Sequence, residues 1–258
     1  MSFFQVDAEH QSQFERAGYV LARQLFKSAE IERLSHYARA DQAVVARATS
    51  RSDSQGGTTT LSLSNDLGDT LYASVVRQQR VAGNMARLLG DEVYHYHHKM
   101  MLKEPYVGGA WEWHQDYGYW YDFGCLYPHM ASCFIAVDRA TRENGCLQII
   151  PGSHLLGRMN HMKIGGQTGA DPERVAAVIE RLPVEYVEME PGDGLFFHGN
   201  LLHRSDQNTS PNPRWSLICC YNTKGNNPYK ESRHPSYSPL ELLSDSDFER
   251  IASAACES

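Results

Sequence analysis

From residue 93 onward the chain becomes a series of short β-prone segments, and this pattern is the strongest constraint on the fold. The candidate strands are residues 93–102, 131–138, 146–150, 184–190, 194–198 and 215–222. Turn sequences separate them, such as Glu-Asn-Gly at 143–145 and Pro-Gly-Asp-Gly at 191–194. Several short strands punctuated in this way predict a β-sandwich or barrel.

The N-terminal third of the chain has a different texture. A first helix is expected from Asp7, which can cap it, to Gly18, followed by a short strand at 19–22. Ser28 is expected to cap a longer helix, and a third helix is predicted over residues 74–89. Residues 50–60 are polar and contain glycine, which predicts a loop able to cover a site.

Together these segments predict a mostly β fold with flanking helices, namely a double-stranded β-helix (jelly roll, cupin-like). A helix is also expected between strands at 171–181, and another after residue 244. We predict one domain over residues 1–258, with a helical N-terminal part at about 1–90, a β-helix core at about 91–225 and a C-terminal tail at 226–258. The length is sufficient for one large domain with a substantial core.

Charge and hydropathy narrow the range of partners. The net charge of −7 disfavours nucleic acid and anionic membranes, and no apolar run approaches the ~18 residues of a membrane span. The N-terminus becomes polar too early for a secretory signal, and the six cysteines include no CxxC motif. We therefore expect a cytoplasmic monomer or homodimer with free thiols, acting on a small molecule.

The most informative side chains are a His-x-Asp pair and a distant histidine. His114 and Asp116 are two residues apart, so on a strand both would point to the same side. His198 and His203 are both candidates for a third ligand from another strand. Two imidazoles and one carboxylate form the ligand set of a mononuclear non-haem Fe(II) oxygenase site, although His-x-Asp alone often occurs by chance.

Arg214 raises the specificity of this pattern. It opens the segment RWSLICCYN, in which Arg214, Ser216 and Ile218 would share one strand face. An inward arginine among apolar neighbours is costly unless an anion pairs with it. The distal carboxylate of 2-oxoglutarate would satisfy it through bidentate contacts, whereas the alternative is a surface arginine on an edge strand.

These residues resemble the phytanoyl-CoA dioxygenase family of Fe(II)/2-oxoglutarate-dependent oxygenases. The similar segments are FERAGYVLARQLFKSAEIERL, WHQDYGYWY, FIAVDRATRENGCLQIIPGSH and PGDGLFFHGNLLHRSDQNTSPNPRWSLICCYN. The resemblance implies a jelly roll that uses Fe(II), 2-oxoglutarate and O2. By the same resemblance, the second histidine of HGNLLH is the ligand, which selects His203 over His198.

The resemblance also implies a role for individual residues. His114, Asp116 and His203 would be the catalytic metal ligands. The residues implied to bind the cosubstrate are Arg214, Ser205, Lys99 and Phe134. Because a carboxylate is present at Asp116, hydroxylation is expected rather than halogenation, in which chloride takes the place of that ligand.

Other features allow two interpretations. Tyr117, Tyr119, Trp120 and Tyr121 either line a substrate pocket or form an ordinary packed aromatic loop. In the segment YHYHHK, strand alternation predicts His95 and His97 on one face. Three arginines at 139, 142 and 158 either bind an anionic substrate or are solvated surface charges, and the second is expected.

The predicted activity is hydroxylation of a C–H bond in a small organic substrate, with succinate and CO2 as coproducts. An amino acid or a secondary metabolite is favoured by analogy with the family. The alternatives are a metal-dependent hydrolase or lyase on a cupin-like barrel and a non-catalytic jelly-roll binding module. The hydrolase requires the metal triad but not Arg214, and the binding module requires neither.

Overall fold

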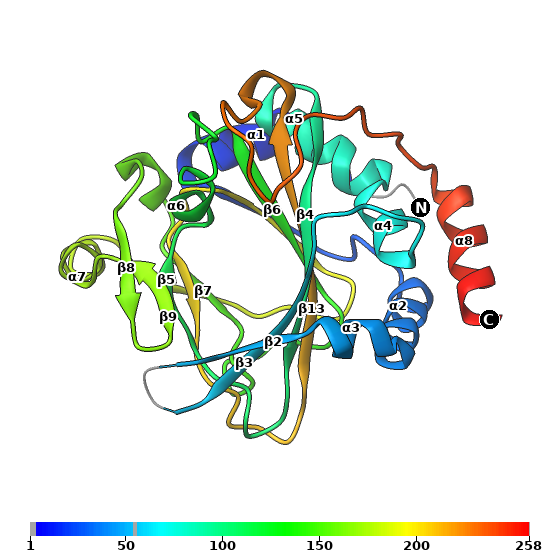
Figure 1. Cartoon of the computed structure of the whole chain (residues 1–258), viewed down its shortest axis with the longest axis horizontal. Coiled ribbons are helices and arrows are strands. Elements are labelled where there is room, and N and C mark those ends of the chain that lie inside the picture. The colour runs from blue at the N-terminus through cyan, green and yellow to red at the C-terminus, as the bar shows by residue number, and fades with distance from the viewer. Residues whose placement is uncertain (1–3, 54–55, 258) are drawn as a thin grey trace.

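The computed structural model describes residues 4–53 and 56–257, with the side chains of the last two of these left out, and is built on two facing antiparallel sheets (Figure 1). Within these residues, seven strands form the major sheet in the order β1-β11-β6-β13-β4-β3-β2. Their bounds are β1 Tyr19–Ala22, β11 Gly194–His198, β6 Met130–Ala136, β13 Arg214–Thr223, β4 Val93–Lys103, β3 Thr58–Ser64 and β2 Thr49–Ser52. The second sheet has the order β10-β7-β12-β5, and its strands are β10 Glu185–Val187, β7 Leu147–Ile149, β12 His203–Ser205 and β5 Trp111–His114. The predicted jelly roll is therefore confirmed.

Strand β13 lies in the middle of the major sheet, and its two faces serve different cores. Ile218 and Cys220 belong to the core between the sheets, whereas Leu217 and Cys219 belong to the core under the helices. This is the alternation expected of a strand whose faces are both covered. It also directs Arg214 toward the space between the sheets, as predicted.

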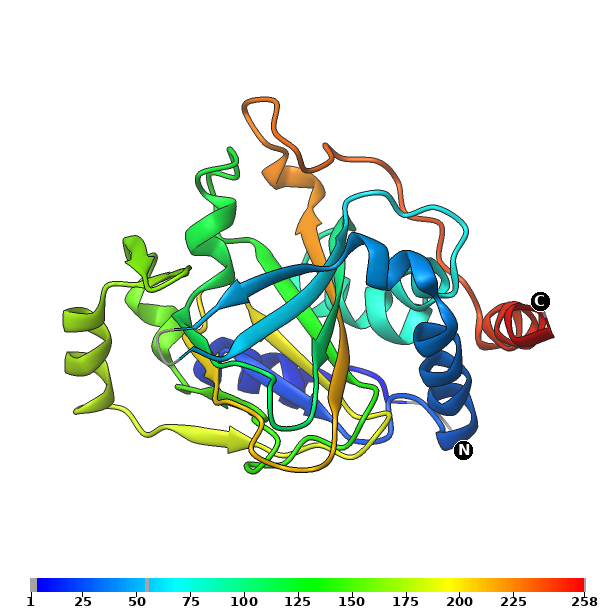
Figure 2. The same ribbon diagram turned by 60° about the horizontal axis from the view of Figure 1, so that its bottom comes forward.

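Helices cover the outer face of the major sheet (Figures 1 and 2). The covering helices are α2 Ser28–Ala40, α4 Leu71–Val76, α5 Asn84–Leu89 and α8 Asp245–Glu257. Their apolar residues, such as Ile31, Met85 and Phe248, pack against one side of the sheet and are shielded from water. The helix α1 Ala8–Ala17 begins at the predicted cap, where Asp7 accepts a 3.0 Å hydrogen bond from the His10 backbone, and ends at Gly18 with φ 80°.

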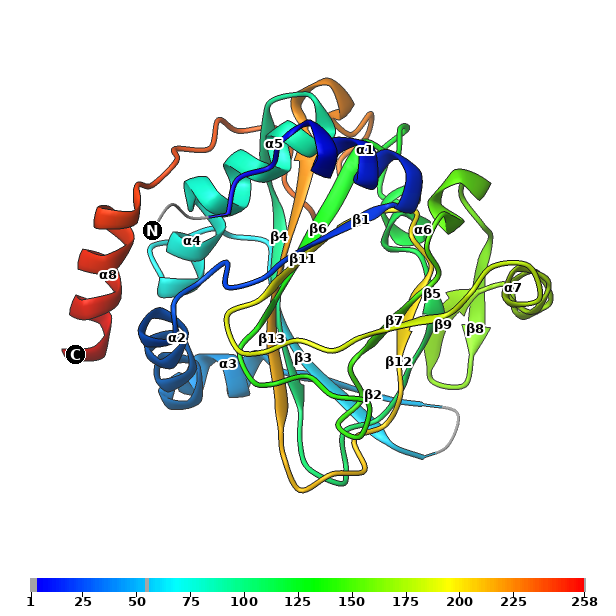
Figure 3. The ribbon, with the colours of Figure 1, turned by 180° about the vertical axis from the view of Figure 1, so that it is seen from behind.

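The remaining elements flank the second sheet or connect strands. Beside that sheet lie the hairpin β8 His161–Ile164 and β9 Gln167–Ala170 and the helix α7 Pro172–Ile179, as Figure 3 shows from behind. The short helical segments are α3 Gln42–Arg47, η1 Gln79–Gly83, α6 Asp116–Trp120, η2 Ser153–Leu156 and η3 Lys224–Asn226. None of the helices in the described parts of the chain is long and apolar enough to cross a membrane.

The prediction of a loop at residues 50–60 is wrong at residues 50–52 and 58–60, which form strands, and residues 54 and 55 lie outside the described residues. Strands β2 and β3 pair antiparallel there and extend the edge of the major sheet. The run Thr58–Thr60 is β-branched and favours a strand. Thr59 is buried there, and its hydroxyl donates a 2.9 Å hydrogen bond to the Gly109 carbonyl, so these polar residues fit a paired strand. Leu61 points into the space between the sheets, so this hairpin forms a wall of the site.

The helix predicted over residues 74–89 is divided into two helices, and the helix expected after Ser28 begins one residue earlier than predicted. The segment starts at α4 after Thr70, and the π-helical turn η1 separates α4 from α5. This turn carries Arg80, which forms a buried 2.6 Å ion pair with Glu30 of α2, a long-range contact that local periodicity does not reveal. For α2, Ser28 is the first helical residue, and the cap is Lys27, whose backbone N–H donates a 2.7 Å hydrogen bond to Glu30.

The cysteines agree with the expectation of free thiols in the described part of the chain. Five cysteines are free and buried, and the adjacent Cys219 and Cys220 face different cores. The side chain of Cys256 lies outside the description.

Candidate active site

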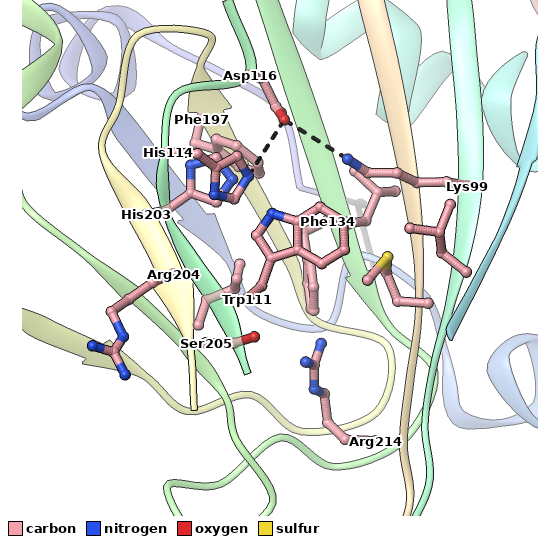
Figure 4. Close-up of a pocket in the computed structure, with 14 residues that line it drawn as sticks. Lys99, Trp111, His114, Asp116, Phe134, Phe197, His203, Arg204, Ser205 and Arg214 are labelled. Atoms are coloured by element: carbon pink, nitrogen blue, oxygen red, sulfur yellow. Dashed lines mark ion pairs between the residues drawn. The ribbon is translucent and has the colours of Figure 1, made fainter. Parts of the chain in front are cut away.

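A buried cluster of His114, Asp116 and His203 lies between the two sheets (Figure 4). One ligand-type atom of each residue lies within 4.8 Å of the other two. His114 ends β5 and His203 begins β12, and the two residues are paired across the sheet with ring centroids 4.0 Å apart. Asp116 is not on a strand as expected, because β5 ends at His114 and Asp116 opens helix α6. The turn into that helix brings the carboxylate to the imidazoles.

Hydrogen bonds fix the tautomer of both imidazoles. Nδ1 of His114 lies 2.8 Å from the carbonyl oxygen of Glu112, and Nδ1 of His203 lies 2.9 Å from that of Leu201. A carbonyl oxygen can only accept, so each Nδ1 carries the proton. Each Nε2 therefore keeps a free lone pair, the state in which histidine binds a metal.

The charges around the cluster favour metal binding. Burial lowers the pKa of His203, and burial together with His203 and Lys99 holds the pKa of His114 well below its usual value. Burial alone would raise the pKa of Asp116, but the Lys99 ammonium 3.7 Å away helps to hold it below its usual value. The second oxygen of Asp116 accepts a 2.8 Å hydrogen bond from the Ser132 hydroxyl. At neutral pH the cluster consists of two neutral imidazoles and one carboxylate, the forms a metal requires.

Gln115, which lies between two of these residues, holds the surrounding segments together. Its fully buried amide donates 2.8 Å hydrogen bonds to the carbonyls of Gly157 and Asn200, and its oxygen accepts one of 2.7 Å from the Met159 backbone. The segment carrying His114 is thereby tied to the turn that precedes β12. Sequence analysis missed this residue, since a glutamine between two ligands has no distinguishing pattern of its own.

A cavity extends from the cluster to Arg214. The residues lining it are Leu61, Lys99, Met101, Trp111, His114, Asp116, Phe134, Leu147, Phe197, His203, Arg204, Ser205, Arg214 and Ile218. All seven residues singled out for the iron and cosubstrate sites are among them. Figure 4 shows Asp116 and Arg214 at opposite ends of this group. The cavity thus joins a metal-type cluster to a buried cation.

The guanidinium of Arg214 has unused hydrogen-bonding capacity. It donates a 3.3 Å hydrogen bond to Ser216 and lies 5.6 Å from the centre of the Phe134 ring, while its Nε has no partner. Among the described residues, no carboxylate lies within ion-pair distance of the Arg214 guanidinium. Burial lowers its pKa to about 10, so it remains charged at neutral pH. A buried cation without a counter-ion is expensive, which makes this end of the cavity suited to an anion.

Lys103 is a second buried basic residue at this end, and sequence analysis overlooked it. Its side-chain nitrogen donates a 3.0 Å hydrogen bond to the Ser205 hydroxyl and another to the Asp206 carbonyl. Burial and the nearby Arg214 hold its pKa well below the usual value. Lys103 lies four residues after Lys99 on β4, so strand alternation alone would have placed the two on the same face.

A second pocket opens on another side of the cluster. The residues lining it are Arg51, Leu61, Leu63, His97, Lys99, Trp111, His114, Asp116, Tyr119, Trp120, Phe123, Arg233 and His234. Of the four aromatic residues considered after the His-x-Asp motif, Tyr119 and Trp120 line this pocket. Tyr117 instead packs in the core with its hydroxyl donating to the Cys125 carbonyl, and Tyr121 is exposed. Two of the four aromatic residues therefore line a pocket and the other two do not, and Trp120 also packs in the core between the sheets.

A β-bulge decides which histidines of β4 reach this pocket. Cys220 pairs with His97 and Tyr221 with His95, so Tyr96 is an extra residue in β4. His95 consequently lies on the same face of β4 as His98, and Nε2 of His95 is 3.0 Å from Nδ1 of His98. The prediction that His95 and His97 share a face is wrong, because the bulge reverses the alternation.

The three arginines expected at the surface lie outside both pockets. Arg139 forms a 2.9 Å ion pair with Glu190, and Arg142 and Arg158 stack over Tyr186 and Tyr121, each 4.4 Å from the ring centre. These contacts agree with the expectation that they are surface charges.

Taken together, the jelly roll, the His-Asp-His cluster and the buried arginine define the class of Fe(II)- and 2-oxoglutarate-dependent oxygenases. The sequence model of the family "Phytanoyl-CoA dioxygenase (PhyH)" matches residues 14–216. The chain belongs to this family. It is a non-haem dioxygenase that uses Fe(II), 2-oxoglutarate and O2 to hydroxylate a C–H bond of a small organic molecule.

Relatives of known activity and solved structures agree with this assignment. The L-proline trans-4-hydroxylase of Streptomyces griseoviridis is 32% identical over 194 residues, covering 69% of this chain and 71% of the relative. The ectoine dioxygenase of Halomonas elongata is 27% identical, covering 85% of this chain and 72% of the relative. Similarity of fold is shown by EctD from S. alaskensis with 2-oxoglutarate and 5-hydroxyectoine, with a TM-score of 0.78 at 24% identity, covering 93% of this chain and 88% of that one.

Proposed function

We propose that His114, Asp116 and His203 hold the catalytic Fe(II), and that Arg214 and Ser205 bind the distal carboxylate of 2-oxoglutarate. One observation carries this proposal: a single buried cavity joins three metal-type ligands to an arginine without a counter-ion. Lys99 and Phe134 complete the cosubstrate pocket.

The protein residues position and shield the reaction. When bound, Fe(II) supplies the oxidative chemistry in which 2-oxoglutarate and O2 give succinate and CO2 and a C–H bond is hydroxylated. Arg214 fixes one end of the cosubstrate, so that its keto-acid end faces the ligand cluster. Apolar side chains such as Phe134 and Ile218 keep water away. Ser132 holds the Asp116 carboxylate in the orientation needed for metal binding.

For the substrate, we propose a small amino acid in preference to a secondary metabolite. The support is the similarity to enzymes named for L-proline and ectoine. The pocket beyond the cluster, with its aromatic walls and a small number of polar and charged groups, is of the kind that small molecules occupy. The single domain over residues 1–258, the cytoplasmic location and the monomer or homodimer remain part of this proposal. Pairing of β1, β2 and β3 with the core strands supports the single domain.

The first test is anaerobic addition of Fe(II) and 2-oxoglutarate, monitored by the visible charge-transfer absorption of the chelate. We expect a band that requires 2-oxoglutarate, is lost in Asp116→Ala and weakens in Arg214→Gln. Arg139→Gln is the matched control, because it removes the same charge from an exposed position. A protein that binds Fe(II) but gives no band would favour the hydrolase or the binding module.

A further inference from the structure

The second pocket contains more positive charge than the iron site requires. Three cations line it, at Arg51, Lys99 and Arg233, and its one carboxylate is Asp116. Asp116 lies in the ligand cluster and already has Lys99 at 3.7 Å. The two arginines are therefore left without a counter-ion in the pocket.

These arginines come from segments far apart in the sequence. Arg51 lies on the edge strand β2, with its guanidinium 5.7 Å from the centre of the Trp111 ring. Arg233 lies in the segment after η3, 4.7 Å from the centre of the Phe123 ring. Among the residues that the structure describes, neither has a carboxylate within ion-pair distance. The aromatic rings hold both guanidinium groups in position. The Nε of Arg233 donates a 3.4 Å hydrogen bond to Nε2 of His234, which leaves its two terminal NH2 groups to face a ligand.

The two histidines that line this pocket do not change its charge. Burial, together with Arg233 and Lys99, lowers the pKa of His234 to about 4, and burial holds that of His97 well below its usual value. His97 accepts a 3.2 Å hydrogen bond from the indole of Trp120. Both rings are neutral at pH 7, so they add no charge, and the three cations that line the pocket outnumber its single carboxylate.

We propose that Arg51 and Arg233 bind a carboxylate of the substrate, and that the enzyme accepts carboxylic acids and rejects their uncharged derivatives. This inference rests on the proposed function for the position of the iron. Arginine is suited to the role because its planar N–H donors match the two oxygens of a carboxylate.

The position of the arginines also indicates which carbon reacts. Arg51 is half-buried and Arg233 exposed, whereas the ligand cluster is fully buried. A carboxylate held by the arginines lies at the mouth of the pocket, so the opposite end of the substrate lies at the iron. We therefore expect hydroxylation at a carbon remote from the carboxylate, and not at the adjacent carbon.

The test is a panel of L-amino acids, beginning with L-proline, each compared with its own carboxamide. Succinate release and perturbation of the Fe(II)·2-oxoglutarate absorption band are measured for each compound, and product positions are determined by NMR. We expect the acids to act and the amides to be at least about tenfold weaker. In Arg51→Gln and Arg233→Gln, the half-saturating concentration of the best acid should rise by about tenfold, with Arg233→Lys recovering part of the loss.

Controls separate this inference from the proposed function. The absorption band without substrate reports iron and cosubstrate binding, so its presence in Arg51→Gln shows that any loss concerns the substrate. Arg181→Gln, at an exposed position on the surface, should behave as the parent. A panel in which no acid acts better than its own amide overturns the inference. The inference is also overturned if either arginine variant raises the KM for 2-oxoglutarate while the half-saturating concentration of the acid stays the same.

Discussion

The two arginine-containing ends of the active site are built differently. Arg214 lies on β13, in the middle of the major sheet, and is 2% exposed. Arg51 lies on the edge strand β2 and Arg233 on an irregular segment, and both reach solvent. A residue on a central strand is fixed by neighbours on both sides, whereas an edge residue can change without disturbing the sheet. The cosubstrate end is therefore rigid, and the substrate end is the part of the site that can vary most easily.

The largest effect is expected at the cluster that both ends share. Asp116→Ala removes the only negatively charged member of the ligand cluster and should reduce succinate formation by about 1000-fold or more with any substrate, because metal chemistry needs the full ligand set. Steady-state turnover and iron content measure this effect. Asp69→Ala, at an exposed position, is the control. Normal turnover in iron-loaded Asp116→Ala would contradict the assignment of the site.

Arg214→Met separates the two ends. Loss of a charge-assisted contact should raise the KM for 2-oxoglutarate by about 100-fold while leaving the selectivity for substrate unchanged. Because the variant also removes a buried cation without a counter-ion, its thermal stability without cosubstrate should equal or exceed that of the parent. A thermal melt with and without 2-oxoglutarate tests both points. A ligand-induced rise in Tm that survives in the variant would refute the cosubstrate role, and a lower Tm of the ligand-free variant would refute the expected stability.

Ser132→Ala tests how the cluster is held in place. The hydroxyl donates to Asp116, and loss of such a contact to a metal ligand typically lowers metal affinity by about tenfold or more. Turnover at saturating Fe(II) should remain close to that of the parent, whereas the iron concentration needed for half-maximal activity rises. Equal iron titrations for parent and variant would show that the hydrogen bond has no such role.

The smallest effect is expected at the contact between Lys103 and Ser205. Each of Lys103→Met and Ser205→Ala should raise the KM for 2-oxoglutarate by about fivefold, consistent with one hydrogen bond of about 1 kcal/mol. Since the two groups act through one contact, the double variant should lose little more than either single one. Fully additive losses would mean that Lys103 and Ser205 act independently.

The parts of the fold that local pattern determines were predictable. Strand β11 has the predicted bounds, and the faces of β13 follow simple alternation. Strands were expected at the metal-type histidines, but the bounds of β5 and β12 were not predicted, because these strands span only four and three residues and their pairing is long-range. The β2–β3 hairpin was missed because a polar edge strand resembles a loop in composition.

The candidate site was predictable where it depends on residue type and less so where it depends on backbone geometry. The seven expected residues line one cavity, since their chemistry is distinctive. The bulge at Tyr96 and the turn that places Asp116 on a helix depend on tertiary packing. The arginines at 51 and 233 are ordinary in sequence, and their function arises only from being brought to the same pocket.

The hydrogen bonds of Gln115 have a consequence for metal selectivity. They fix the segment that carries His114 and Asp116 against the turn before His203 without help from a metal. A preformed set of two imidazoles and one carboxylate binds several divalent ions, and Co²⁺, Ni²⁺ and Cu²⁺ bind such ligands more tightly than Fe²⁺ does. The identity of the bound ion then depends on which metals the cell supplies, and replacement of Fe²⁺ by a tighter-binding ion is a route to inactivation.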